Sequence, residues 1–207
     1  MSNQPNLKPL YPPHPSQQEP EEESPQIQKT VDALSLLPHP EGGYYVETDR
    51  DPLRIPNPFA PTSDTDKDRS ASTTIFYLLT PNRSFGAFHR NKGRTVHVWQ
   101  RGRGRYVIIH ADEVEGGKGK ARVETFVVGP DVAAGERMQW VVEGGKYKAS
   151  FLLEDGGSGE SKEGLLISEV VVPGFEFADH DFLRREKMEE LLTEEQVREM
   201  DWMLRVE

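Results

Sequence analysis

The sequence predicts a mainly all-β protein, an antiparallel sandwich or barrel with a short helix at each end. Between residues 72 and 172, short runs of β-branched and aromatic residues follow one another. Glycine-rich stretches such as Arg101–Arg105 and Asp155–Gly159 separate these runs, which is typical of tight turns between strands. Helical periodicity is confined to the segments before and after the runs, and strands without intervening helices favour antiparallel architectures.

The first 23 residues predict a disordered tail. Residues 1–23 are rich in Pro, Gln and Glu and almost lack periodic apolar residues. Such a segment buries too little apolar surface to offset the entropy of ordering it. The folded domain is therefore expected at residues 24–183, with a helical extension over residues 184–207.

A helix is predicted directly after the tail. Ser24 suits the N-cap and Pro25 suits the first helical position, while Pro38 stops the helix. The apolar face is expected to consist of Ile27, Val31 and Leu34.

Strands fill most of the remaining chain. We expect them to start near Tyr44 and to cover residues 72–80, 85–91, 94–100, 105–111, 122–129, 138–142, 148–154 and 165–172. The Pro- and Asp-rich segment 49–69 is typical of a long surface loop. After Asp179 the pattern becomes helical, and Thr193 with Gln196 forms a capping-box signature.

Composition excludes several classes of function. The net charge of −10 disfavours binding to nucleic acid through a basic face. The chain has no cysteine, which excludes disulfides and thiolate chemistry, so any metal would need His or oxygen ligands. No apolar run approaches the roughly 20 residues that span a bilayer, and no secretory signal precedes the fold. A soluble protein of the cytoplasm, with no membrane partner, is the expectation.

Period-2 alternation places several polar side chains on one face of two neighbouring strands. His89 and Asn91 share a face of the first strand, and Thr95, His97 and Trp99 share a face of the second. Such a face is polar without being charged, which suits the lining of a ligand cavity. Satisfied core or surface histidines are the structural alternative.

Four blocks of the sequence together resemble a known family. These blocks are LLPHPEGGYYVET, STTIFYLLTPNRSFGAFHR, VGPDVAAGERMQWVVEGGKYKASFLL and VVPGFEFADHDFL, and they occur in this order from Leu36 to Leu183. They resemble the cupin superfamily, specifically the small DUF985 (cupin_5) family, and the FHRNKGRTVH stretch is similar to its fungal members. The resemblance implies a double-stranded β-helix of the jelly-roll kind, a homodimer and a central cavity.

The general cupin pattern allows the metal question to be tested position by position. If Gly102 is the glycine of the first motif, Thr95 replaces its glutamate, Asn91 replaces its second histidine and His89 keeps the first. Lys148 replaces the histidine of the second motif. One of the family's four ligands is left, so no cofactor is predicted; a rearranged divalent-metal site with His89, His97 and Glu41 stays open.

Lys148 and its neighbours suggest what the cavity holds instead. Beside His89 and His97, Lys148 favours an anion or a carbohydrate, unless it pairs with Glu41 or Glu143. The residues predicted to contact this small molecule are Glu41, Tyr45, Asn91, Thr95, Trp99, Gln139 and Lys148.

Four functions are considered from these residues and the resemblance, of which a structural or storage role, implied by the resemblance alone, is the fourth. The first is a cupin that binds a small molecule without the usual cupin metal. The second is an enzyme similar to sugar epimerases and isomerases, in which His89 or His97 removes a proton and Tyr44 or Tyr45 returns it. A metal-dependent enzyme is the third, and whether the chain is an enzyme stays open.

Overall fold

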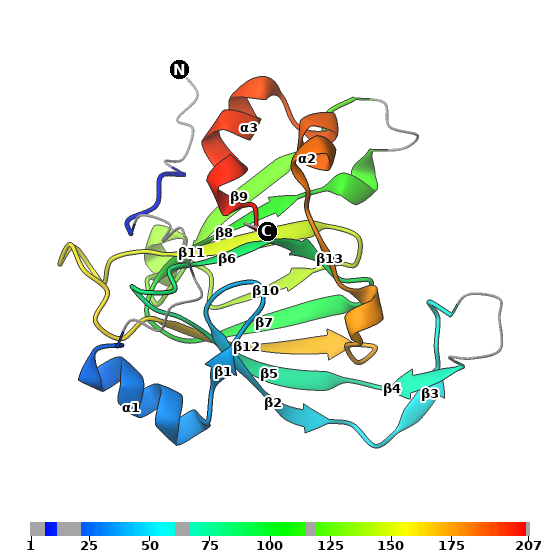
Figure 1. The fold of residues 1–207 in the computed structure, drawn as a ribbon, viewed down its shortest axis with the longest axis horizontal. Helices are drawn as coiled ribbons and strands as arrows, with labels where there is room; N and C mark the ends of the chain where they lie inside the picture. Colours follow the sequence, from blue (N-terminus) through cyan, green and yellow to red (C-terminus); the bar gives the residue numbers. More distant parts are fainter. Residues whose placement is uncertain (1–6, 12–21, 61–66, 115–118, 206–207) are drawn as a thin grey trace.

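Two antiparallel sheets packed face to face form most of the structure (Figure 1). The computed structural model describes residues 7–11, 22–60, 67–114 and 119–205. The two sheets are joined by an isolated bridge between Val128 and Arg137 rather than by a continuous ladder, so they form a jelly-roll sandwich and not a closed barrel. The mainly all-β prediction is confirmed.

The six-stranded sheet has the strand order β1-β2-β5-β12-β7-β10. Its strands are β1 (Leu37–Pro38), β2 (Tyr44–Arg50), β5 (Thr73–Leu79), β12 (Leu165–Val172), β7 (Arg94–Arg101) and β10 (Gln139–Val142).

The five-stranded sheet has the order β13-β6-β11-β8-β9. Its strands are β13 (Asp181–Phe182), β6 (Phe85–Arg90), β11 (Tyr147–Leu152), β8 (Gly104–Ile109) and β9 (Val123–Val128). Short 3-10 turns connect strands of both sheets at Ala111–Glu113, Val132–Ala134 and Phe177–Asp179.

Alternation along the strands sorts their side chains into an inner and an outer set. On β7, Thr95 and His97 are buried whereas Val96 and Val98 are half-buried, as the sequence predicts. The inner faces enclose an apolar cluster of Tyr77, Leu79, Tyr106, Ile108, Phe126, Val128, Trp140, Val142, Leu152, Leu165 and Ile167. This cluster forms the core between the two sheets.

A β-bulge turns His89 toward the inside of the sandwich. Lys148 pairs with His89 and Ser150 pairs with Gly86, so two residues of β6 lie opposite the single residue Ala149 of β11. Without the extra residue, the odd spacing from Gly86 to His89 would place these two on opposite faces. The bulge therefore decides the direction of the His89 side chain.

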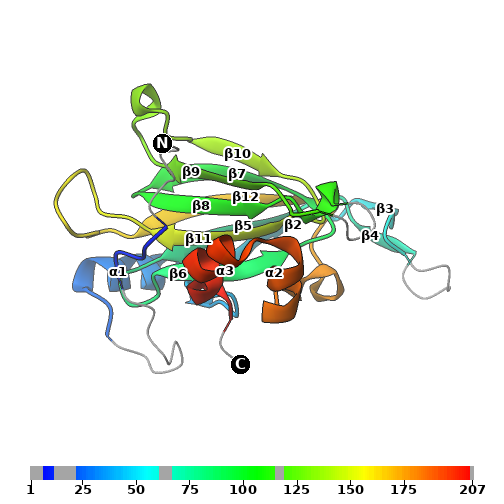
Figure 2. The same ribbon diagram turned by 90° about the horizontal axis from the view of Figure 1, so that it is seen from above.

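Helices cover the outer face of each sheet. Helix α1 (Pro25–Leu34) begins with the predicted Ser24 cap and lies against the six-stranded sheet through Ile27 and Val31. Helices α2 (Arg185–Leu191) and α3 (Glu194–Met200) lie beside β6 and β11 (Figure 2), with a short 3-10 turn at Asp201–Met203. The predicted capping box of Thr193 and Gln196 is present.

Two sequence predictions require correction. Residues 7–11, within the segment predicted to be disordered, pack on the domain, because Leu7 is buried and the Tyr11 hydroxyl accepts a hydrogen bond from the Ser161 backbone. Residues 1–6 and 12–21 lie outside the described part of the chain. The segment predicted to be a loop contains a hairpin of β3 (Arg54–Pro56) and β4 (Asp68–Ser70), since edge pairing satisfies its backbone groups.

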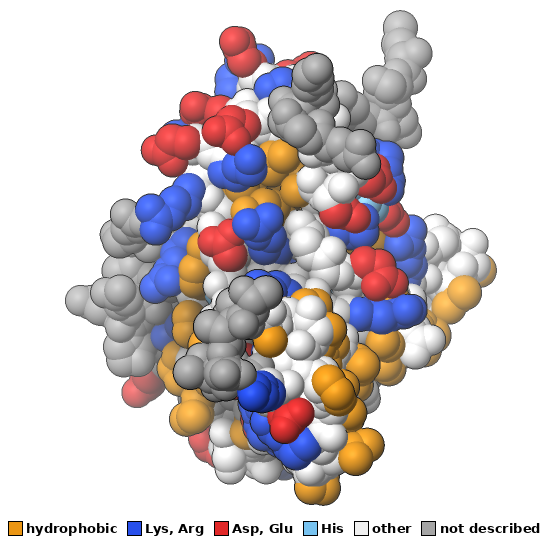
Figure 3. All heavy atoms as spheres, turned by 90° about the vertical axis from the view of Figure 1, so that its right-hand side faces the viewer, with side chains coloured by type: hydrophobic (Ala, Val, Ile, Leu, Met, Phe, Trp, Pro, Cys, Tyr) orange, Lys and Arg blue, Asp and Glu red, His pale blue; other side chains and the backbone are white. Residues whose placement is uncertain are grey.

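The side of the molecule toward which this hairpin extends carries charged side chains of both signs (Figure 3). Figure 3 shows acidic and basic side chains interspersed there, without a broad area of one sign. Within the described ranges, no helix has the length and apolar character to cross a bilayer.

The β7–β8 turn packs closely against the backbone of Gly164, which gives a prediction about stability. Gly102 has a φ of +76°, and a Cβ there would lie 2.0 Å from the Gly164 carbonyl oxygen. We expect Gly102→Ala to lower the free energy of unfolding by the positive-φ strain of roughly 1–2 kcal/mol plus a further 1–3 kcal/mol, roughly, for the clash. Gly135→Ala is the control, because its φ is +88° but nothing lies within 4 Å of the added Cβ. If urea unfolding gives equal losses of unfolding free energy for the two variants, the close contact with Gly164 adds no cost and the prediction is wrong.

Candidate functional site

Two clusters of polar side chains lie inside the sandwich, against an otherwise apolar core. The first consists of Glu41, His89 and His180, and the second of His97, Lys148 and Glu169. Their members come from both sheets and from two connecting loops. No contiguous stretch of sequence contains either cluster.

In the first cluster, a single carboxylate lies between two imidazoles. Glu41 Oε1 is 2.7 Å from His180 Nε2, and Glu41 Oε2 is 3.2 Å from His89 Nδ1. The His89 and His180 rings are nearly parallel, with centroids 5.2 Å apart. His89 Nδ1 is also 2.9 Å from the Ala87 carbonyl oxygen. No described residue forms a hydrogen bond with His89 Nε2, which leaves this nitrogen available.

Backbone contacts hold Glu41 in place. Its carbonyl oxygen accepts from the Ala87 N–H at 2.7 Å, and its own N–H donates to His39 Nδ1 at 3.1 Å.

Burial raises the pKa of the Glu41 carboxyl, but His89, His39 and His180 outweigh burial and hold the pKa at about 2. Burial lowers the pKa of His89 to about 3, with the Lys148 charge acting in the same direction. At neutral pH the cluster is a carboxylate beside a neutral His89.

In the second cluster, Lys148 is neutralised within the protein. Lys148 Nζ donates to Glu169 Oε2 at 2.6 Å and lies 2.9 Å from His97 Nε2. The side chains of Lys148 and Glu169 are only 4% and 9% exposed. Burial opposes ionisation of Glu169, but Lys148 and His97 hold its pKa well below the usual value. Lys148 thus pairs with an acid, as one of the two alternatives had it, but the partner is Glu169 and not Glu41 or Glu143.

The carboxylates of both clusters act on two buried tyrosines. Burial raises the pKa of Tyr77 and of Tyr106 well above the usual value, and the charges of Glu41 and Glu169 both add to this. Both phenols therefore stay protonated. The Tyr77 hydroxyl donates to the Gly42 carbonyl at 2.8 Å, and a Cβ on Gly86 would come within 2.5 Å of this hydroxyl. The absence of a side chain at Gly86 makes room for it.

Most of the predicted lining residues point inward, although they do not form one group. Thr95 and His97 are buried on β7, whereas Trp99 is half-buried and donates from Nε1 to the Gly102 carbonyl. Asn91 follows β6, and its buried Oδ1 lacks a hydrogen-bond partner among the described residues. His97 joins Lys148 and not His89, so the rearranged His89–His97–Glu41 set does not assemble.

Three further predicted residues belong to neither polar cluster. The Tyr44 hydroxyl donates to Glu23 at 3.0 Å, and its ring packs with the helix α1 cluster, so it is not beside His89. Tyr45 points inward but contacts His39, with ring centroids 4.4 Å apart. Gln139 is exposed, because Trp140 and not Gln139 pairs with His97 in the β10–β7 register.

Sequence reasoning missed three members of the interior. Glu169 is a lone charged residue in the apolar run Leu165–Val172, and a charge at the centre of such a strand predicts a buried partner. His180 was not among the predicted site residues; its link to Glu41 spans 139 residues and has no local signal. Trp140 stacks on His97 with an interplanar angle of 9°.

Comparison with known proteins identifies the family. The family model described as cupin superfamily (DUF985) matches residues 28–183. The chain belongs to this cupin family. It is 42% identical to an uncharacterized protein of Saccharomyces cerevisiae over 182 residues, which cover 86% of this chain and 85% of the relative. The predicted resemblance, including its fungal character, is confirmed.

Solved structures agree with this fold. A hypothetical protein from Leishmania major is 27% identical, with a TM-score of 0.73 over 87% of this chain and 99% of that one. A protein from Shewanella oneidensis has a TM-score of 0.65 at 23% identity over 89% of this chain and 100% of that one. The cupin jelly roll is therefore shown, and these similarities assign no activity.

The positions that the general cupin pattern gives to a metal do not fit one in this cupin. They hold His89, Asn91, Thr95 and Lys148. The Lys148 ammonium has no lone pair to offer and is already bonded to Glu169. A metal at those four positions would have one imidazole, one amide and one hydroxyl as donors.

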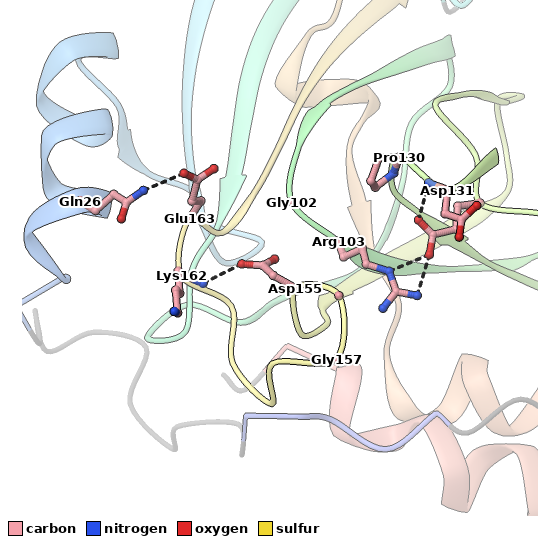
Figure 4. A pocket seen from close by; sticks show the side chains of 11 residues that line it. Gln26, Gly102, Arg103, Pro130, Asp131, Asp155, Gly157, Lys162 and Glu163 are labelled. Carbon is pink, nitrogen blue, oxygen red and sulfur yellow. Dashed lines mark hydrogen bonds and ion pairs between the residues drawn. The ribbon is translucent and has the colours of Figure 1, made fainter. Parts of the chain in front are cut away.

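A surface cleft of about 650 Å³ lies away from both clusters (Figure 4). It is lined by residues of α1, the β7–β8 turn and the loop before β12, and contains none of the predicted site residues. Within it, Arg103 pairs with Glu136 at 2.6 Å and Gln26 donates to Glu163 at 2.7 Å.

The buried ion pair gives a prediction about stability. Lys148→Met leaves Glu169 buried without its cation, so we expect a loss of about 3–5 kcal/mol in the free energy of unfolding. The double variant Lys148→Met/Glu169→Met should recover most of this loss, because it removes both charges. Urea unfolding of the three proteins measures the coupling, and additive losses would show that the pair is not coupled.

The same pair predicts an acid limit. The folded pKa of Glu169 is below its ordinary value of 4.5, so its contribution is complete above about pH 4.5 and is lost as the pH falls through the folded value. We expect wild-type stability to fall below pH 4.5 more steeply than that of Lys148→Met/Glu169→Met. Urea unfolding at pH 7, 5, 4 and 3 compares them, and parallel profiles would refute the assignment.

Proposed function

We propose that this cupin binds a small neutral molecule rich in hydroxyl groups, such as a carbohydrate, inside the sandwich. The observation that supports it most is hydrogen-bonding capacity left unused among buried groups. Trp140 is 4% exposed, and its Nε1 lacks a partner among the described residues. An unpaired buried donor costs about 1–3 kcal/mol, so an interior without a ligand would favour apolar side chains here.

The charge balance supports a neutral ligand over an anion. The sequence alone left both open, because Lys148 suggested a cationic pocket. In the structure, Glu169 takes the Lys148 charge and Glu41 adds a second carboxylate. A carboxylate or phosphate would approach two acidic groups with one ammonium that is already paired. Hydroxyl groups can donate to carboxylates and accept from the indole N–H without bringing charge.

Proton transfer of the epimerase or isomerase kind stays an alternative. It is supported by the Glu41 contact with His89 Nδ1, which orients the ring and leaves Nε2 as a base. The predicted acid Tyr44 is engaged with Glu23, so another hydroxyl would have to return the proton. Binding needs no such additional group. The homodimer and the cytoplasmic location stay predictions of the sequence and the resemblance.

A tryptophan variant tests the binding proposal. Trp140→Phe keeps an aromatic ring against His97 but removes the unpaired N–H. Neutral monosaccharides, sugar alcohols and sugar nucleotides are titrated by calorimetry beside small carboxylates and inorganic phosphate. We expect a neutral hydroxyl compound to bind wild type, and Trp140→Phe to weaken it about 5–30-fold, as loss of one buried hydrogen bond would.

Trp202→Phe is the matched control. Its indole N–H donates to backbone carbonyls outside the sandwich interior, so binding should be unchanged. Selective binding of the anions, or equal weakening by both tryptophan variants, would overturn the proposal.

A further inference from the structure

We infer that Glu41, His89 and His180 form a site for one divalent transition-metal ion of the zinc class. Only His89 belongs to the positions that the cupin pattern gives to a metal. The inference goes beyond the proposed ligand, which is assigned to other groups. It rests on a donor set drawn from three separate elements: the turn before β2, strand β6 and the loop before β13.

The donors are of the right kind and close enough. One carboxylate oxygen and one nitrogen from each imidazole lie within 4.8 Å of one another, and the described residues contain no other such group of three. Ligands around a tetrahedral zinc ion are roughly 3.4 Å apart, given metal–ligand bonds of about 2.1 Å. Small side-chain rotations bring the donors to this spacing. Two imidazoles and a carboxylate select zinc or iron over magnesium and calcium.

The surrounding structure holds each donor in place. Glu41 is fixed by its backbone bonds to Ala87 and His39. The Ala87 carbonyl lies 2.9 Å from His89 Nδ1, and a carbonyl on the ring of a ligating histidine is the usual outer contact in metal sites. The ring of His180 packs edge-on against Phe182, with centroids 4.6 Å apart.

Charge also favours a cation. Glu41 supplies a full negative charge, and the ammonium of Lys148 is neutralised by Glu169 at 2.6 Å. The positive charge of Lys148 therefore does little to repel an ion at this site. The side chains of Glu41 and His180 are 11% and 12% exposed, so an ion can reach them from the solvent.

An ion at this site and a base role for His89 exclude each other, because the imidazole lone pair serves one purpose at a time. Binding of a neutral molecule at Trp140 is compatible with either. The two proposals therefore fail separately: a metal test that fails leaves sugar binding intact, and the reverse also holds.

The test is metal binding by the full chain, purified without a histidine tag and stripped with a chelator. Zn²⁺ is titrated by calorimetry into wild type, His180→Gln and His110→Gln, and bound metal is then measured by elemental analysis after dialysis. We expect one Zn²⁺ per chain in wild type and at least a 100-fold weaker site in His180→Gln. His110→Gln is the matched control, since it removes another buried histidine that contacts carboxylates outside this cluster.

Co²⁺ provides a measurement that needs no variant. In wild type, Co²⁺ bound by these three residues should give visible absorption bands that one equivalent of Zn²⁺ removes. No Zn²⁺ binding by folded wild type, absence of the Co²⁺ bands, or unchanged binding in His180→Gln would each overturn the inference.

Discussion

The buried ion pair of Lys148 and Glu169 sets the charge that the interior of this cupin offers to a ligand or a metal. An ammonium inside an apolar sandwich is tolerated because a carboxylate lies 2.6 Å away and an imidazole accepts beside it. The pair occupies the region where the cupin pattern expects a metal ligand. It also removes the positive charge that an anionic ligand would need. The proposed ligand class and the proposed metal position both rest on this pairing.

Backbone geometry complements the pair. The bulge at Ala87 and Phe88 turns His89 inward, and the missing side chain of Gly86 leaves room for the Tyr77 hydroxyl. The Ala87 amide binds Glu41 from the turn before β2. The bulge and the adjacent Gly86 on strand β6 thus bring an imidazole, a carboxylate and a phenol together. Regular pairing over the same residues would direct His89 into the apolar cluster beneath α2 and α3.

The two polar clusters differ in exposure. The side chains of Glu41 and His180 are 11% and 12% exposed, and with His89 they offer donors for a cation. His97 and Trp140 stack deeper, beside the neutralised lysine. Burial and the charges of both carboxylates raise the pKa of Tyr77 and of Tyr106.

The sequence by itself determined the β architecture, the α1 cap, the capping box at Thr193 and the inward face of β7. Each of these depends on neighbours a few residues apart, through periodicity or capping. Only the tertiary structure decided the partners of Lys148 and His89. Glu169 and His180 lie 21 and 91 residues away along the chain from Lys148 and His89, and strand order and loop position decide which of the chain's many acids and histidines meet them. Tertiary structure also decided that Trp140, and not Gln139, lies opposite His97. A shift of the β10–β7 register by one residue would move every side chain of β10 to the other face.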